Sequence, residues 1–360
     1  MINYHLLWLI PSLIFSVGSF LPLSKSQHWI FRFFDFIRLQ LLVILISLLI
    51  LGSFLQLNNP SLKAAGLLLL LIAIAYNLFI LYPYFSLSRK KRKISPNGVS
   101  ILSMNVMQSN KNHQLVIQTI NKIKPDILLT METDTNWEEA LTEIENDYTH
   151  SVKVAKSNRY GMHVYTKLKL LDYKVHYLIS REHPSIEVKL LDKEDNEFVF
   201  WAIHPPPPSP TEKPTSKQKD GELMMLAKLI RKTELPVITA GDYNNVCWSK
   251  ISKLFMEITN LKNARIGKGF NSTFPADWPL LRFPIDLLFH STNIFVEDIK
   301  VLAYVGSDHL PLHSHFRILD KDLNPKTKLD SELKNKMNRK IKQGKKAAIV
   351  ENDESVNPEE

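Results

Sequence analysis

Three long apolar runs occupy the N-terminal quarter of the chain. They extend from Leu6 to Leu23, from Leu39 to Leu57 and from Ala64 to Leu87. Each is close to the roughly 20 residues that an α-helix needs to cross a bilayer. We therefore predict that residues 1–93 form a transmembrane segment with three helices at about 6–23, 39–57 and 64–87.

Two alternatives apply to these runs. The first run could be a cleaved signal peptide, but no Lys or Arg precedes Lys25 and no small-x-small cleavage site follows the run. All three could instead be buried helices of a soluble protein, which the unbroken run "LQLLVILISLLILGSFLQL" disfavours. A retained, multi-pass membrane segment is the favoured interpretation.

Positive charges between the runs predict the orientation. The first loop carries Lys25, Arg32 and Arg38, the second carries Lys63, and "RKKRK" from Arg89 to Lys93 follows the third run. Lys and Arg accumulate on the cytoplasmic side of membrane proteins. The N-terminus is therefore predicted outside and the main domain on the cytoplasmic side.

From residue 97 the pattern changes to short apolar runs of strand length. Four of them stop abruptly at polar residues: "VSILSMN" at Asn105, "PDILLTME" at Glu132, "EFVFWAIH" at His204 and "LPVITAGD" at Asp242. The stretches "HQLVIQTINKIKP" and "GELMMLAKLIRKT" have the periodicity of helices packed on a sheet. Residues 97–318 are therefore predicted to form an α/β domain.

The polar residues at the strand ends are candidate ligands. Singly, each could be an ordinary strand-end cap or turn residue. Asp286 in "RFPIDLLFH" and the adjacent Asp308 and His309 add further polar groups to apolar stretches. If the strand ends lie together, their carboxylate and amide oxygens suit Mg²⁺ or Mn²⁺.

Charge and cysteine content narrow the function classes. Residues 1–96 have a net charge of +8, residues 97–318 of zero and residues 319–360 of +1. The positive charge of the chain therefore belongs to the membrane segment and gives little support to nucleic-acid binding. Cys247 is the single cysteine, which excludes an intrachain disulfide and a multi-thiolate metal site.

Three motifs in order carry a family resemblance. "PDILLTMET", "AGDYNN" and "GSDHLPL", between about Val99 and Phe316, resemble the endonuclease/exonuclease/phosphatase superfamily of metal-dependent phosphoesterases. The three preceding apolar runs resemble a membrane-bound bacterial branch, although Leu287 stands where that branch often has His. The resemblance implies a four-layer αββα sandwich, in a multi-pass protein of the bacterial inner membrane.

The same resemblance implies a metal site. Glu132 would be the principal ligand, with Asn105 and Asp308 beside it, and the ion would be Mg²⁺ or Mn²⁺. The region "NRYGMHVYTK" would offer a substrate-binding side chain, which we assign to Arg159 or Tyr160.

The remaining motif residues would carry out catalysis. Asp242 would orient or deprotonate the attacking water, and Asn244 would hold the phosphate. His204 and His309 would stabilise charge on the phosphoryl oxygens, and Asp286 would support one of these histidines or help the leaving group.

The predicted function is a membrane-anchored, metal-dependent phosphoester hydrolase that uses an activated water. Its substrate could be a nucleic acid, a phospholipid head group or a small phosphoester, and the bilayer is its expected partner. The alternative is a membrane-tethered binding or scaffolding protein that keeps the fold without turnover. The sequence has no G-x-S-x-G or other sign of a nucleophilic triad.

The adjacent Asp308 and His309 would point to opposite faces of a regular strand. Both can reach one site only if the chain bends, and Gly306 permits a bend. We therefore predict that His309 faces the phosphate, while Asp308 contacts the metal site or orients a catalytic imidazole. As a loop-end residue, His309 is expected to contribute little to packing.

Residues 319–360 form a charged tail that is predicted to be disordered or loosely helical. Leu329, Leu333, Met337 and Ile341 recur every four residues among lysines. Such a stripe suits a helix on an anionic leaflet, but a solvated helix is the favoured alternative.

Overall fold

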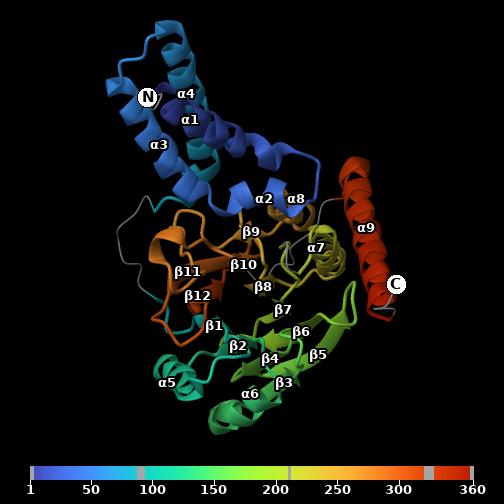
Figure 1. Cartoon of the computed structure of the whole chain (residues 1–360). Coiled ribbons are helices and arrows are strands. Elements are labelled where there is room, and N and C mark those ends of the chain that lie inside the picture. Colours follow the sequence, from blue (N-terminus) through green and yellow to red (C-terminus); the bar gives the residue numbers. More distant parts are fainter. Residues whose placement is uncertain (1–3, 87–93, 210–211, 320–327, 357–360) are drawn as a thin grey trace.

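The computed structural model describes residues 4–86, 94–209, 212–319 and 328–356. The basic run at 89–93, which contributed to the predicted orientation, lies outside these residues. Figure 1 shows a helical bundle at one end of an α/β domain, with a long helix along the side of that domain.

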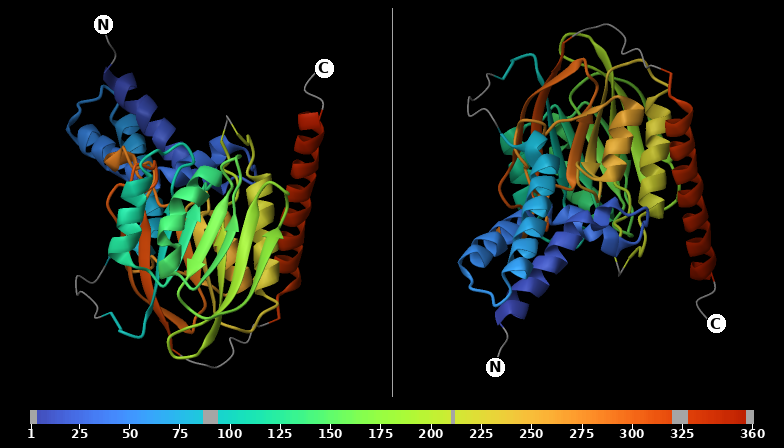
Figure 2. Two further views of the ribbon diagram at one scale, coloured as in Figure 1. Left: turned by 90° about the horizontal axis from the view of Figure 1, so that it is seen from below. Right: turned by 90° about the horizontal axis from the view of Figure 1, so that it is seen from above.

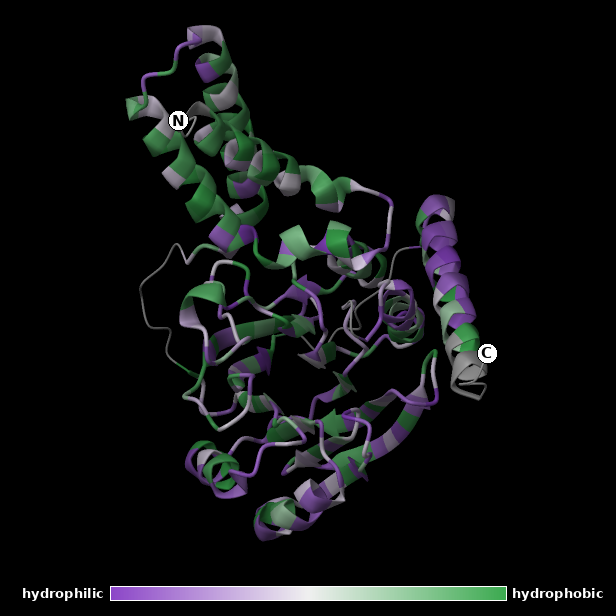
Figure 3. Ribbon diagram, viewed as in Figure 1, coloured by the Kyte–Doolittle hydropathy of each residue, from purple (hydrophilic) through white to green (hydrophobic). Residues whose placement is uncertain are grey.

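The bundle contains α1 (Tyr4–Phe20), α3 (Arg38–Phe54) and α4 (Pro60–Leu81). The Trp8 indole donates a hydrogen bond to the Leu48 carbonyl over 2.8 Å. A Cβ atom at Gly52 or Gly66 would collide with this indole, so glycine lets the three helices approach closely. The helices are strongly apolar on their outer surfaces (Figure 3).

By length and composition, two of these helices can cross a membrane. They correspond to Leu6–Leu23 and Pro60–Tyr84, and the bent pair α2–α3 makes a third if it counts as one span. Helix α2 (Trp29–Phe36) meets α3 at 74°. This helix was not predicted, and it lies between the bundle and the α/β domain (Figure 1).

Two six-stranded mixed sheets form the domain. The order of the first is β11 (Ile294–Val301), β12 (Leu312–Ile318), β1 (Val99–Asn105), β2 (Ile127–Met131), β4 (Met162–Thr166), β3 (His150–Val154). The order of the second is β5 (Leu170–Tyr177), β6 (Pro184–Leu191), β7 (Glu197–Ile203), β8 (Val237–Asp242), β10 (Asp286–His290), β9 (Lys262–Asn263). The sheets pack face to face (Figure 2).

Helices cover both outer faces and complete four layers. Helices α5 (His113–Ile123) and α6 (Thr135–Ala140) lie on the first sheet, and α7 (Lys217–Ile230) and α8 (Lys250–Thr259) on the second. The predicted αββα sandwich is confirmed.

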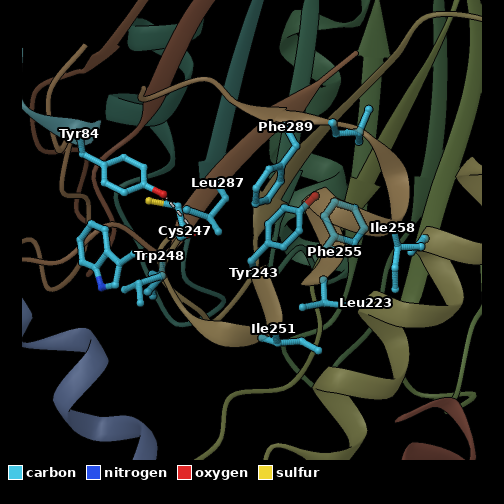
Figure 4. Close-up of a cluster of buried hydrophobic side chains, with 14 of the residues drawn as sticks. Tyr84, Leu223, Tyr243, Cys247, Trp248, Ile251, Phe255, Ile258, Leu287 and Phe289 are labelled. Atoms are coloured by element: carbon cyan, nitrogen blue, oxygen red, sulfur yellow. Dashed lines mark hydrogen bonds between the residues drawn. The ribbon is translucent and has the colours of Figure 1, made fainter. Parts of the chain in front are cut away.

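Leu287 belongs to the apolar layer between the second sheet and its helices. It is fully buried near Tyr243 and Cys247 (Figure 4). Its neighbour Asp286 points the other way because side chains alternate along a strand. The departure from the family pattern at Leu287 is therefore a packing change outside the candidate site.

Each sheet has one parallel pair, and this arrangement positions the site. Strands β1 and β2 are parallel and connected through α5; β7 and β8 are parallel and connected through α7. Parallel strands bring their carboxyl ends to the same edge. Antiparallel β10 begins at this edge, where Asp286 pairs with Asp242.

The C-terminal segment, which was expected to be disordered or loosely helical, contains a long helix. Residues Ser331–Val356 form α9, which packs along α7 (Figure 1). Met337 and Ile341 are buried, and Lys340 forms a 2.8 Å ion pair with Asp220. The apolar stripe therefore contacts the α/β domain, because two partly apolar helix surfaces are available to cover each other.

Candidate active site

The predicted residues meet at one edge of the sandwich, around a cavity of about 890 Å³. Eight of them line the cavity: Glu132, Arg159, Tyr160, His204, Asp242, Asn244, Asp308 and His309. The other two, Asn105 and Asp286, lie behind and bond to lining residues. All ten residues are thus brought together, although they span more than 200 positions of the chain.

Glu132 follows β2 in the left-handed region, with φ of 63°. Its carboxylate accepts hydrogen bonds from the Asn105 side-chain amide over 2.9 Å and from the Gln108 backbone amide over 3.2 Å. Burial raises the pKa of Glu132, the two hydrogen bonds oppose this rise, and the nearby Asp308 carboxylate adds to it. Strained backbone of this kind persists where the surroundings hold it, commonly at functional sites.

Asp242 ends β8, and the next turn fixes its carboxylate. The Asn244 backbone amide, at φ of 47°, donates to Asp242 Oδ1 over 2.8 Å. The Asn105 amide lies 3.3 Å from Asp242 Oδ2, so it connects Asp242 with Glu132. Burial raises the pKa of Asp242 to about 7, and the positive charge of His309 opposes this rise.

His309 lies in the loop before β12 and not in a strand. The chain bends at Gly306, where φ is 89°, as predicted. Ser307 Oγ donates to the Asn105 carbonyl over 2.7 Å and accepts from the His309 backbone amide over 3.0 Å. The loop is therefore tied to the end of β1.

The His309 ring bridges two carboxylates. Its Nδ1 lies 2.8 Å from Asp286 Oδ2, and its Nε2 lies 3.5 Å from Asp242 Oδ2. Burial alone would lower the pKa of His309, but the two carboxylates raise it to about 10. Asp286, rather than Asp308, orients this imidazole, which is protonated at neutral pH and shielded by the Phe274 ring at 4.8 Å.

His204 has the opposite electrostatic character. Burial lowers its pKa to about 3, and the neighbouring His309 and His183 lower it further. Its Nε2 lies 3.6 Å from Asp242 Oδ2, and its Nδ1 has no hydrogen-bond partner among the described residues. His204 is therefore a neutral imidazole that is available to bond a substrate oxygen.

Arg159 and Tyr160 also line the cavity. Arg159 is exposed, with φ of 69°, and Tyr160 is nearly buried. The Tyr160 hydroxyl donates to Glu212, and its ring contacts those of His183 and His204. Arg159 is thus free to reach a substrate, while Tyr160 supports the histidines.

The oxygen-rich group at Glu132 fits a divalent metal ion. Glu132 and Asp308 offer carboxylate oxygens of the kind that Mg²⁺ and Mn²⁺ prefer. Asn105 instead donates its amide nitrogen to Glu132, and its Oδ1 accepts from the Met107 backbone amide over 3.0 Å. Burial raises the pKa of Glu132 and the Asp308 carboxylate adds to this rise, so a cation would be favourable beside these two carboxylates. Asp242, Asp286 and His309 also bring one ligand atom each within 4.8 Å of one another, so they form a second group that could hold a metal ion.

Comparison with known proteins agrees with this geometry. The sequence model described as the Endonuclease/Exonuclease/phosphatase family matches residues 101–309. The chain belongs to this family. Members of the family are metal-dependent hydrolases of phosphoester bonds, and the chain is assigned to the same enzyme class. No curated protein matches the chain.

Solved structures share the fold. The endonuclease/exonuclease/phosphatase from Bacteroides vulgatus superposes with a TM-score of 0.51 at 16% identity, covering 61% of this chain and 99% of its own. The human Nocturnin catalytic domain, with bound sulfate, gives 0.50 at 17% identity, covering 63% and 96%. A humanized D. rerio TDP2 gives 0.50 at 12% identity, covering 61% and 99%.

Several residues around the site were not predicted. Lys219 of α7 is buried and donates to the Asn244 carbonyl over 2.9 Å, so it holds the turn after Asp242 in place. Burial lowers the pKa of Lys219 to about 8. Gln108 and Phe274 also contact catalytic groups. None of them stands in a motif, and a lysine in a helical repeat is normally read as solvent-exposed.

Proposed function

We propose that the protein is a membrane-anchored, Mg²⁺- or Mn²⁺-dependent phosphoester hydrolase. The observation that carries the proposal is the connected set of Glu132, Asn105 and Asp242, with the protonated His309 beside Asp242. It supplies oxygen ligands, a base and a positive charge within one cavity. A scaffold without turnover would not need this complete set.

The reaction would be a single displacement at phosphorus. The Asp242 carboxylate accepts a proton from a water molecule, whose oxygen forms the new P–O bond as the ester P–O bond breaks. The leaving alkoxide takes a proton from solvent. Asn244 holds the phosphate, and His309 and His204 donate hydrogen bonds to its oxygens. A metal ion held by Glu132 and Asp308, with Asn105 positioning Glu132, would supply Lewis-acid neutralisation of phosphoryl charge.

Hydrolysis is expected to depend on the metal. The full-length protein in detergent would be tested on bis(p-nitrophenyl) phosphate, phospholipids, nucleotides and oligonucleotides. Mg²⁺ or Mn²⁺ should stimulate release of product at least about tenfold over EDTA, because charge on the phosphoryl oxygens is otherwise poorly neutralised. Full activity under strong chelation contradicts the metal site, and no hydrolysis of any substrate favours a scaffold.

Contacts between the first loop and the α/β domain bear on the orientation of the protein in the membrane. The loop that contains α2 contacts the α/β domain, because the Ser216 amide donates to the Gln27 carbonyl over 2.8 Å and the Trp248 indole to the Asp35 carbonyl over 2.8 Å. These contacts require the first loop and the domain on the same side. Three spans satisfy that requirement, and the basic residues favour the cytoplasm.

The C-terminus is therefore expected in the cytoplasm. A green fluorescent protein fused after Glu360 should fluoresce in bacterial cells, whereas alkaline phosphatase at the same position should be inactive, since it needs the oxidising periplasm. An alkaline phosphatase fusion placed in the loop between α3 and α4 is the positive control. The reverse result at the C-terminus overturns the orientation.

A further inference from the structure

Helix α2 forms one wall of the catalytic cavity. Trp29, Phe33 and Phe36 line the same cavity as Asp242 and His309. Their spacing of four and three residues places the three aromatic rings on one face of the helix. The segment that joins the first two predicted spans therefore contributes directly to the substrate cavity.

Aromatic residues of the α/β domain extend this wall to the catalytic centre. The Phe36 ring contacts Phe283 at 5.4 Å, and Phe283 contacts Phe274 at 5.5 Å. Phe274 in turn packs on the His309 ring at 4.8 Å. The result is a continuous apolar strip from α2 to the catalytic imidazole.

Several hydrogen bonds fix α2 in this position. The Trp29 amide donates to the Pro214 carbonyl over 3.1 Å, and the Gln27 side chain donates to Asp220 over 2.7 Å. The Trp248 indole holds the Asp35 carbonyl at the other end of the helix. The aromatic strip is therefore a built part of the cavity.

The strip begins beside the apolar bundle. Helix α2 lies between the bundle and the α/β domain (Figure 1), and the bundle helices consist mainly of hydrophobic residues (Figure 3), many of them exposed. Phe33 is 46% exposed, although it faces a cavity lined by polar catalytic groups. A partly exposed aromatic strip that connects a membrane bundle with a phosphoester site fits a substrate with an apolar tail.

The charges of the cavity disfavour a nucleic acid. Among the described residues that line it, Arg159 is the one Lys or Arg, against Glu132, Glu212, Asp242 and Asp308. Binding of a polynucleotide requires many cationic contacts to phosphates. A lipid presents one phosphoester to the site and leaves the rest of its surface apolar.

We propose that the strip formed by Trp29, Phe33, Phe36, Phe274, Phe283 and Ile285 is a tail-binding subsite, and that the substrate is a membrane lipid phosphoester. This inference rests on the proposed hydrolase function and names its substrate class. The lipid would enter from the bundle side, with its hydrocarbon chain against α2 and its phosphate between Asn244 and His309.

The full-length protein in mixed micelles is suited to test chain-length dependence. Long-chain phosphatidylglycerol and phosphatidic acid would be compared with their dibutanoyl analogues and with a single-stranded oligonucleotide. We expect kcat/KM at least about tenfold higher for a long-chain ester, because each buried methylene favours binding by a factor of about four. Hydrolysis without chain preference, or preference for the oligonucleotide, overturns the subsite while the hydrolase function stands. Failure on every phosphoester instead removes the hydrolase function.

Substitutions in α2 test whether the hydrocarbon chain binds at the proposed subsite. Phe33→Ser should lower the long-chain to short-chain ratio by about tenfold. Ile30→Ser is the matched control, because Ile30 lies on the same helix, is 45% exposed and does not line the cavity. Its ratio should change less than twofold. Equal losses in both variants would show general membrane association and overturn the subsite.

Phe33→Leu separates burial of a hydrocarbon chain from stacking on a base. Leucine keeps an apolar side chain without an aromatic face, so it should retain most of the chain preference. A ratio as low as that of Phe33→Ser, together with a loss of oligonucleotide cleavage, would indicate base stacking and contradict a lipid substrate.

Discussion

Replacing Asp242 by asparagine is expected to lower the rate of phosphoester hydrolysis by about 10³- to 10⁴-fold. The variant keeps the size of the side chain and can keep the hydrogen bond from the Asn244 amide. It removes the carboxylate that accepts the proton of the attacking water. The measurement is kcat with saturating Mg²⁺ on the best substrate of the screen.

The same substitution should not reduce the stability of the apoprotein. Burial raises the folded-state pKa of Asp242 to about 7, above its ordinary value of 3.8. The stability that Asp242 contributes is therefore fully present below that ordinary value and is lost as the pH rises through 7. At pH 8 in EDTA, the Tm of Asp242→Asn should equal or exceed that of the wild type.

Two outcomes would contradict this role. Retention of more than a tenth of the wild-type rate would mean that another group takes the proton. A loss of activity that follows a large fall in Tm would mean that Asp242 acts through folding. Asp172→Asn is a useful control, because it makes the same carboxylate-to-amide change at an exposed residue of β5 that does not line the cavity.

Local patterns in the sequence predicted an α/β domain whose strands end in polar residues, and the family resemblance supplied the four-layer sandwich and the roles of the site residues. A short apolar run that ends at Glu132 or Asp242 defines a strand and its polar end within a few residues. The parallel βαβ arrangement then brings such ends to one edge. The family motifs added Asp286 and the loop at His309, whose bend Gly306 made recognisable.

Contacts between distant segments were not predictable in the same way. Helix α2 has only eight residues, too few for a clear helical period, and its position depends on Trp248, more than 200 residues away. The stripe on α9 showed that one face is apolar, but not whether lipid, water or α7 covers it. Periodicity identifies a face that needs a partner and leaves the partner open.

The protonation states of His204 and His309 could not be predicted from the sequence either. His204 and His309 were given the same expected task of stabilising charge on the phosphoryl oxygens. Both histidines are buried, which lowers a histidine pKa, but only His309 lies between two carboxylates that reverse this effect; His204 instead has two neighbouring histidines that lower its pKa further. These neighbours come from strands β8 and β10 and from the loop before β6, and no spacing rule connects them.

Replacing His309 by alanine should lower turnover by about 10²- to 10⁴-fold. It should also destabilise the fold, which differs from the expectation for an exposed loop-end residue. His309 is 4% exposed and bonds Asp286 over 2.8 Å. Its loss leaves Asp286 and Asp242 buried without a positive partner. Breaking a buried pair costs about 3–5 kcal/mol, so Tm should fall by about 10 °C.

The double variant His309→Ala/Asp286→Asn separates these two effects. Removing the Asp286 carboxylate removes much of the uncompensated buried charge, so most of the lost Tm should return. Turnover should stay at the level of the single variant, because no imidazolium remains to face the phosphate. Tm from calorimetry and kcat, both measured on the same preparations, show whether His309 acts in catalysis or only in stability. If activity returns together with Tm, His309 serves the fold alone, and the charge that stabilises the phosphoryl oxygens must come from the metal ion or from Arg159.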